Sequence, residues 1–568
     1  MIQSIRPILM HALASVVFAA TVQAVEPEDA PAGGPPSRHM ELLEILKQHR
    51  GVIAPTLPDV HPRHTAFNHE APIPPQCYTK TDGRFNPCYV CHQNQVPGRE
   101  NAMNDGELQV EYAFSDVGMT NHWQNLFVDR SAAVAAISDD EILAWIDQDN
   151  YSTLAPRLRE AEFGGWIPDL TGLEQGAGAF DAQGFAKDGS LWVAFNYKPF
   201  PSTFWPTNGS TDDVMIRLAP PFRTDAASNY SADVYKANLA IVEANVKGLT
   251  EIGALPIDER KLEVDLDGDG TLGIIDIVRK VDRYVGAAAD EYLDTYLYPA
   301  GTEFLHTVRY VGLGADDEIV LSRRMKEVRY LKKWQPYRKV IYARQYELEG
   351  FSKDGGALPH YQLIGDHGLD NGYGWSVQSF IEGVDGELRT ATYEENLFCM
   401  GCHTSIGATI DKTFSFPRKV DGAKGWGYIN LRGMPDAPNR GEVKGEIATY
   451  LERIGGGGEF RSNPEMAARW FKADGSVDQE AVARARDVYD LVMPSRRRAL
   501  ELNKAYRTIV AEQNYLHGRD AFVTAPANVY EFIDNDTAPT LPLDRFHNWD
   551  IRLDWNAPSA ISRLSTIP

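Results

Sequence analysis

Cys88-Tyr89-Val90-Cys91-His92 and Cys399-Met400-Gly401-Cys402-His403 are the two stretches that constrain the structure of this chain most. Each is a Cys-x-x-Cys-His string, and together they use four of the five cysteines in 568 residues. Because cysteine is so sparse here, two such strings are not an accident of composition. They therefore indicate two sites of the same chemistry, one toward each end of the chain.

The spacing within each string suits covalent attachment of haem. Two thiols separated by two residues can reach the two vinyl groups on one edge of a haem, and the histidine that follows then lies under the iron. A zinc knuckle and a thioredoxin-like redox pair are the alternatives. Zinc bound by the four thiols would leave both histidines without a role. The sequence therefore predicts two covalently bound haem c groups, held by Cys88, Cys91 and His92 and by Cys399, Cys402 and His403.

On these residues the chain resembles the c-type cytochromes as a class. The resemblance implies that His92 and His403 are the proximal iron ligands, and it covers only the two short strings. Bacterial di-haem cytochrome c peroxidases also carry two such strings and a calcium site. In that family the strings lie much closer together than His92 and Cys399 do here, so no peroxidase catalytic residue is carried over.

The sixth ligand of each iron decides what such a site can do, because histidine or methionine closes the position and an open position admits substrate. The candidates are His61, His64, His69 and Met103 for the first haem, His360, His367 and His517 for the second, and Cys77. Cys77 has no disulfide partner. An inert buried thiol, an axial thiolate and a substrate-reactive sulfur all remain open for it. Arg496-Arg497-Arg498 either pairs with haem propionates or forms a solvated helix face.

An acidic loop at residues 265–276 follows the twelve-residue calcium loop position by position. The predicted ligands are Asp265, Asp267, Asp269, Thr271 and Asp276, with Gly270 at the sharp turn. Because position twelve is Asp, the loop resembles the dockerin type of half-hand. We expect one structural Ca²⁺, with Leu272 as an apolar anchor and a helix over 274–285. An acidic turn without metal is the alternative, but aspartates this close repel one another unless a cation neutralises them.

The N-terminus predicts export. Arg6 precedes an apolar run over residues 7–22, and Val22-Gln23-Ala24 gives a cleavage pattern, so residues 1–24 are predicted to be a signal peptide. The run is shorter than the ~20 residues that span a bilayer. No cysteine near the cleavage point offers a site for a lipid anchor. We expect a periplasmic or extracellular protein without a membrane span.

The net charge of −23 indicates which classes of molecule the protein can bind. A field of this sign repels nucleic acid and anionic lipid and steers toward basic partners. The alternative is that acidity only keeps an exported protein soluble.

Residue patterning predicts an α+β fold, in which mainly helical and loop-rich haem-binding segments flank a mixed α/β middle domain. The predicted boundaries are a flexible leader at 25–38, a first haem c segment at 39–155, the middle domain with the calcium loop at 156–350, and a mainly helical second haem c domain at 351–568. Helices are predicted at 39–50, 138–145, 229–247, 288–297, 444–454, 464–472 and 478–516, and strands at 191–197, 307–311, 318–321 and 339–348. The last helix is expected to be interrupted at Arg496-Arg497-Arg498, behind Pro494.

The function predicted on this basis is periplasmic redox chemistry. One haem of an oxidoreductase would relay electrons while the other binds peroxide or a sulfur compound. The alternative is a non-catalytic electron-transfer cytochrome with two six-coordinate haems, although the chain is longer than electron shuttling needs. A scaffold or recognition module is a third possibility, for which the half-hand is the only hint. The expected partners are redox proteins with a basic docking surface, and a small-molecule substrate.

Overall fold

The computed structural model describes residues 73–558, except 97, 100, 202–204, 356, 358 and 456–462. The predicted signal peptide, leader and helix at 39–50 lie outside the described residues, as do His61, His64 and His69. Residues 49–568 form one compact unit by their contacts.

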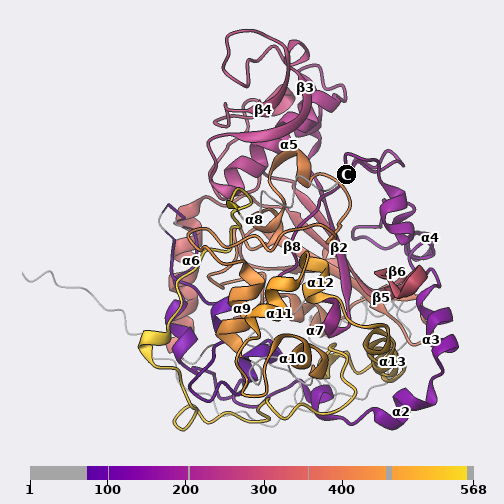
Figure 1. Cartoon of the computed structure of the whole chain (residues 1–568). Coiled ribbons are helices and arrows are strands. Elements are labelled where there is room, and N and C mark those ends of the chain that lie inside the picture. Colours follow the sequence, from indigo (N-terminus) through magenta and orange to yellow (C-terminus); the bar gives the residue numbers. More distant parts are fainter. Residues whose placement is uncertain are drawn as a thin grey trace, which may run out of the picture. The chain divides into compact units, whose positions relative to one another are not determined.

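An antiparallel sheet of seven strands runs through this unit (Figure 1). The strands are β1 Val193–Ala194, β2 Thr211–Arg217, β5 Glu303–Leu313, β6 Ile319–Lys333, β7 Leu369–Asp370, β8 Trp375–Glu382 and β9 Leu388–Thr390. Their order is β1-β2-β5-β6-β8-β7, and β9 also pairs with β8. β5 and β6 form the long central hairpin, and their β-branched and aromatic residues favour a pleated, buried surface.

Helices cover both faces of this sheet. The helices are α2 Ser131–Ala136, α3 Asp139–Ile146, α4 Leu154–Glu160, α5 Ala232–Lys247, α6 Lys339–Asp354, α7 Tyr393–Asn396, α8 Ser415–Arg418, α9 Glu446–Ile454, α10 Pro464–Trp470, α11 Gln479–Arg484, α12 Val488–Val492 and α13 Arg496–Glu512. α3 and α13 pack against Ile381 of β8, whereas α4 packs against Phe380 of the same strand. Adjacent residues of a strand point to opposite faces, so these helices lie on opposite sides. Helices on an antiparallel sheet confirm the predicted α+β class.

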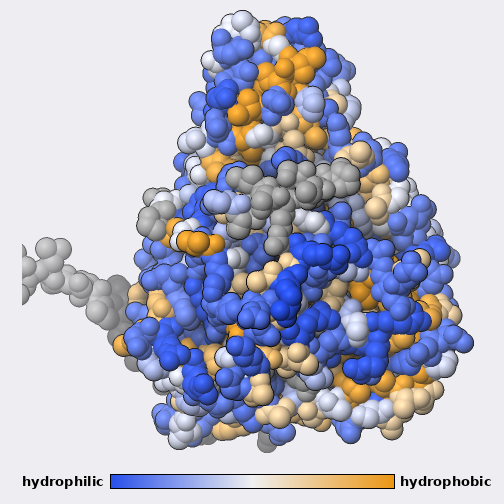
Figure 2. Space-filling model, in the orientation of Figure 1, coloured by the Kyte–Doolittle hydropathy of each residue, from blue (hydrophilic) through white to orange (hydrophobic). Residues whose placement is uncertain are grey.

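A separate two-stranded sheet pairs β3 Ile252–Asp258 with β4 Ile274–Val278 and packs on α5. Figure 1 shows it apart from the main sheet, and Figure 2 shows hydrophobic residues gathered on this part of the visible face. The helix predicted over 274–285 is therefore wrong. Its first residues form β4, because a run of β-branched isoleucine and valine suits an extended chain better than a helix. Leu272, predicted as an apolar anchor, is 44% exposed.

The sequence predicted several other elements correctly. α5 ends where the 229–247 prediction ends, and Gly248 takes the left-handed conformation that closes it, with φ of 64°. α3 begins as expected, since the Ser138 hydroxyl accepts a hydrogen bond from the Glu141 amide at 3.2 Å. α9 and α10 confirm the helices at 444–454 and 464–472. β5 contains the strand at 307–311, and β6 begins within the strand predicted at 318–321.

Three other predictions are wrong in type or length. The strand at 339–348 is helix α6, whose alanine, arginine, glutamine and glutamate residues are good helix formers. The helix at 288–297 is reduced to a 3-10 turn at Gly286–Ala288 followed by turns. The helix at 478–516 has the predicted interruption behind Pro494, where Ser495 caps α13, but the part before it divides further into α11 and α12, and Asp487 caps α12.

Candidate functional site

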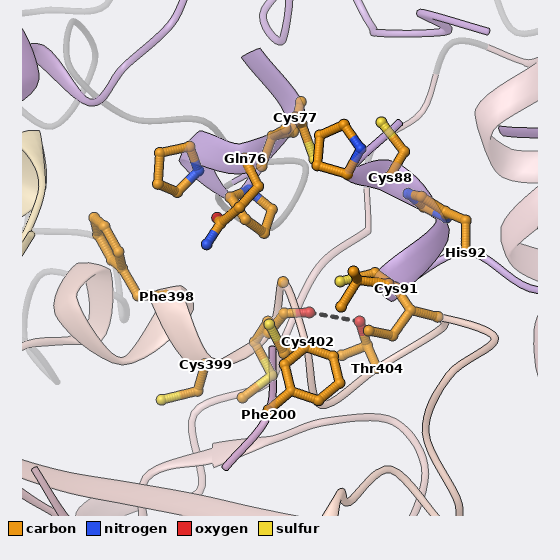
Figure 3. A pocket seen from close by; sticks show the side chains of 18 of the residues that line it. Gln76, Cys77, Cys88, Cys91, His92, Phe200, Phe398, Cys399, Cys402 and Thr404 are labelled. Carbon is orange, nitrogen blue, oxygen red and sulfur yellow. Dashed lines mark hydrogen bonds between the residues drawn. The ribbon is translucent and has the colours of Figure 1, made fainter. Parts of the chain in front are cut away.

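One cavity collects the cysteines of both Cys-x-x-Cys-His strings, whereas His403 of the second string is not one of its lining residues. Its volume is about 340 Å³. All five cysteines line it, together with His92 (Figure 3). The thiols of two strings that are far apart in the sequence therefore line the same cavity.

The first string is a single helical turn. The 3-10 turn Cys88–Val90 begins after Pro87, and the Asn86 side chain accepts a hydrogen bond from the Cys88 amide at 2.9 Å. The amides of Cys91 and His92 donate to the Cys88 carbonyl at 3.1 and 3.0 Å. A helical turn brings residues three apart to one side, so both thiols lie on the wall of the cavity.

The second string repeats this turn. A capping box between Thr392 and Glu395 opens α7, which continues into the 3-10 turn Leu397–Cys399. The amides of Cys402 and His403 then donate to the Cys399 carbonyl at 3.3 and 3.0 Å. The two strings thus share one backbone geometry although their flanking sequences differ.

Both histidines are oriented through the same ring nitrogen. His92 Nδ1 lies 3.0 Å from the Asp105 carboxylate, and His403 Nδ1 lies 2.7 Å from the Lys412 carbonyl oxygen. An acceptor at Nδ1 places the proton there and leaves the lone pair on Nε2, as in most histidines that bind metals. Burial lowers the pKa of His403 to about 4, so this ring is neutral at pH 7. Each imidazole therefore presents Nε2 as a possible metal ligand.

The thiols do not favour the alternatives to haem. Burial raises the pKa of Cys88 to about 12 and that of Cys402 to about 11, and it raises the pKa values of Cys91 and Cys399 as well. A thioredoxin-like pair depends on a depressed pKa. Within the described ranges, one group of three His, Cys, Asp or Glu residues has ligand atoms within 4.8 Å of one another. It consists of Glu259, Asp265 and Asp267. In the described residues, no three of the four string cysteines bring their sulfur atoms within that distance of one another.

The end of the cavity near the second string carries paired charges. Glu327 lies 2.8 Å from Arg329 and 3.1 Å from Arg519, and all three residues line the cavity. Burial would raise the pKa of Glu327, but the two guanidinium groups hold it at about 2. Arg519 also lies over the Phe398 ring at 4.6 Å. Arg329 and Arg519 therefore place two guanidinium groups at this end of the cavity, beside the carboxylates of Glu327 and Asp520.

No pattern in the sequence singled out Arg329 or Arg519, since one lies within β6 and the other in a loop after α13. The arginine cluster that stands out in the sequence is instead Arg496-Arg497-Arg498. There Arg496 pairs with Asp317 at 2.9 Å and Arg497 pairs with Glu501 at 2.7 Å. None of the three arginines lines the cavity.

The candidates for a sixth ligand separate into two groups. Cys77, in the 3-10 turn Pro75–Tyr78, lines the cavity, as does Met103. Burial and the neighbouring thiols Cys88 and Cys402 raise the pKa of Cys77 well above its usual value. The remaining described candidates are not lining residues: His360 and His367 are exposed and His517 is half-buried.

Glu259 lies beside the acidic loop, although the loop pattern does not contain it. Ligand oxygens of Glu259, Asp265 and Asp267 lie within 4.8 Å of one another. Glu259 is fully buried and accepts hydrogen bonds from the amides of Leu266 and Gly273 at 2.6 and 3.1 Å. Five residues separate it from Asp265, the start of the twelve-residue pattern, so the pattern does not include it.

The other predicted ligands lie around this cluster. Asp269 accepts hydrogen bonds from the amide and hydroxyl of Thr271 at 2.7 and 2.8 Å, and Asp276 is exposed on β4. Lys280 pairs with Asp265 at 3.0 Å. The loop is therefore organised around its own acidic side chains.

Comparison with known proteins places the chain among lipoproteins. Residues 61–490 match a family model described as a "-like lipoprotein". The chain is 31% identical over 549 residues to a protein of Aquifex aeolicus (strain VF5) named "Uncharacterized lipoprotein", covering 82% of this chain and 89% of that protein. No solved structure matches the chain.

These matches correct two predictions. The c-type cytochrome class, inferred from two short strings, is wrong as the family of this chain, because the matches cover most of it and name a lipoprotein. The redox function that followed from that class, as an oxidoreductase or as an electron-transfer cytochrome, is wrong for the same reason.

The lipoprotein matches agree with export, which the N-terminus predicted. In the part of the chain that the structure describes, no helix has both the length and the apolar character needed to cross a membrane.

Proposed function

The chain belongs to the lipoprotein family whose model it matches, and we propose that its cavity holds two covalently attached haem groups, one at each Cys-x-x-Cys-His string. Cys88 and Cys91 attach the first haem, and Cys399 and Cys402 attach the second. His92 and His403 bind the irons. The proposed function is binding, and no reaction is assigned to it.

The orientation of the two histidines carries this proposal. Both rings direct Nδ1 to an acceptor and leave Nε2 for a metal, and both follow a turn that presents two thiols to the same cavity. Apolar and aromatic side chains beside those thiols, such as Phe200 and Phe398 (Figure 3), suit the face of a macrocycle. Arg329 and Arg519 suit its carboxylates, because guanidinium groups bind carboxylates through two donors.

In this proposal the loop-rich segments that carry the strings are the haem-binding parts of the α+β fold, and the central hairpin β5–β6 supports them. Val308 of β5 and Arg329 of β6 line the cavity. The periplasm is the proposed compartment, since thioether bonds to haem are formed after export.

Covalent haem content tests the proposal directly. The full-length protein, exported in a host that attaches haem to Cys-x-x-Cys-His strings, is expected to keep two haems per chain after denaturation and solvent extraction. Cys88→Ala with Cys91→Ala should leave one haem, and Cys399→Ala with Cys402→Ala should leave the other. Cys77→Ala is the matched control and should keep both. A wild-type chain without covalent haem, measured by mass, would sink the proposal.

We also propose that the acidic loop binds one structural Ca²⁺. Glu259, Asp265 and Asp267 bring carboxylate oxygens together, which are the ligands that Ca²⁺ prefers. Asp269, Thr271 and Asp276 are the further ligands expected from the loop pattern. The ion would offset the repulsion between the clustered carboxylates.

A further inference from the structure

The loops that follow the two strings are hydrogen-bonded to each other. The Ala408 amide, in the loop after His403, donates to the Cys91 carbonyl of the first string at 3.0 Å. The neighbouring Gly407 amide donates to the Asp105 carboxylate at 2.9 Å. Two chain segments that are remote in sequence thus share backbone contacts directly behind the cavity.

One carboxylate serves both loops. Asp105 Oδ2 lies 3.0 Å from His92 Nδ1 and accepts the Gly407 amide, while Oδ1 accepts the Gln93 amide at 3.0 Å. Asp105 is only 5% exposed, so water does not compete for these bonds. The group that orients the first histidine is therefore also a fixed attachment point for the second loop.

The Gly407 carbonyl reinforces this junction. It accepts hydrogen bonds from the Gln93 side chain and, at 2.8 Å, from the Arg99 guanidinium, both of which are buried. A Cβ at position 407 would lie 2.2 Å from Asp105 Oδ1 and 2.6 Å from the Gln93 carbonyl oxygen. No side chain fits there unless the two loops separate.

We propose that Asp105 and Gly407 couple the two sites, so that the position of the second loop sets the orientation of His92. Asp105 is a positioning residue that acts on the first iron ligand, and Gly407 permits the close approach that lets Asp105 hold both loops. A movement of the second loop is transmitted to the first histidine through one carboxylate. For the bound state, this inference rests on the proposed attachment of haem.

Gly407→Ala tests the coupling in the loaded protein. The variant is placed in a Cys399→Ala, Cys402→Ala background, so that only the haem at Cys88 and Cys91 is present. Gly407 lies in the other loop, and its amide donates to Asp105 rather than to His92. Even so, the low-temperature electron paramagnetic resonance signal of the His92-bound iron is expected to shift. Gly350→Ala, at an exposed glycine with nothing within 4 Å of an added Cβ, should leave the signal unchanged. An unshifted signal in Gly407→Ala would overturn the coupling.

Deuterium exchange tests the coupling without haem. In the cofactor-free full chain, Gly407→Ala is expected to speed exchange at least tenfold in peptides covering residues 91–93 as well as 407–409. Asp105→Asn should do the same, because its amide replaces a carboxylate oxygen that accepts two hydrogen bonds, while the exposed neighbour change Glu107→Gln should not. Faster exchange confined to 407–409 in Gly407→Ala would overturn the inference. This result is independent of whether haem is attached, so failure of the coupling and failure of haem binding are distinguishable.

Discussion

At the scale of single residues, Glu446 in α9 illustrates how buried charge stabilises the region behind the cavity. Its carboxylate receives two hydrogen bonds from Arg418, at 2.7 and 2.6 Å, and lies 3.2 Å from Lys198, and all three side chains are buried. Burial alone would raise the pKa of Glu446, but the two cations hold it at about 2. A depressed carboxyl pKa stabilises the fold above the unfolded-state pKa and loses that contribution as the pH falls through about 2.

Glu446→Gln should therefore lower the free energy of unfolding at pH 7 by about 3 kcal/mol. It removes the anion that pairs with buried Arg418, whereas Lys198 keeps Asp436 at 2.5 Å. The difference from wild type should shrink between pH 4.5 and pH 2, as measured by denaturant unfolding at several pH values. Glu480→Gln, at an exposed position with a 3.9 Å partner, should cost less than about 1 kcal/mol. A loss in Glu446→Gln that stays constant down to pH 2 would contradict the assignment.

At the scale of elements, the acidic loop between β3 and β4 makes the calcium proposal testable. Ca²⁺ is expected to raise the melting temperature of the wild-type chain, because a ligand that binds only the folded state stabilises it. Asp267→Asn should abolish most of this increase, and so should Glu259→Gln, since both remove a carboxylate from the cluster. Asp282→Asn, at an exposed aspartate beyond the loop, is the matched control and should keep the calcium effect. Equal melting temperatures with Ca²⁺ and with chelator in the wild type would show that the loop binds no ion.

Elements were predictable where local signals agreed with tertiary packing. α5 has a serine cap, a run of apolar residues and a closing glycine, and its bounds followed from the sequence. α6 and β4 were assigned to the wrong class because short apolar patterns fit helix and strand equally well. For β4, pairing with β3 decided the outcome, and for the 478–516 stretch the caps at Asp487 and Ser495 decided it.

The capping box of α7 links an element to the candidate site. Thr392 and Glu395 fix the start of the segment that carries Cys399, and Arg389 holds Glu395 at 2.8 Å. Thr392→Ala should lower the free energy of unfolding by about 1 kcal/mol. It should also speed deuterium exchange in the peptide that contains the second string. Thr392→Ser, which retains the hydroxyl, should behave as wild type. Slow exchange in Thr392→Ala would show that the cap does not order this segment.

At the scale of the whole molecule, the sequence located every cysteine of the cavity but not the cavity itself. Both strings follow from their spacing, which is a local signal. Their common cavity depends on contacts such as that between Asp105 and Gly407, which no local pattern encodes. Glu259, Arg329 and Arg519 were missed for the same reason, because each joins its site through tertiary structure rather than through a motif. The family, in turn, followed from matches over most of the chain and not from the strings.

A segment near the end of the described residues packs against the first string, and this contact gives a prediction for the molecule as a whole. Trp549, near the end of the described residues, donates a hydrogen bond from Nε1 to the Tyr89 carbonyl at 2.5 Å and packs edge-on against the Tyr89 ring at 5.8 Å. Trp549→Ala removes a buried indole and is expected to cost about 3–5 kcal/mol. Exchange should therefore speed up in the peptide carrying Cys88 and Cys91, although the change lies in the last segment. Leu543→Ala, at a side chain that is 78% exposed, should leave both stability and exchange unchanged. If Trp549→Ala destabilised only its own segment, the first string would be ordered without the C-terminal segment, and the cavity would not depend on this closure.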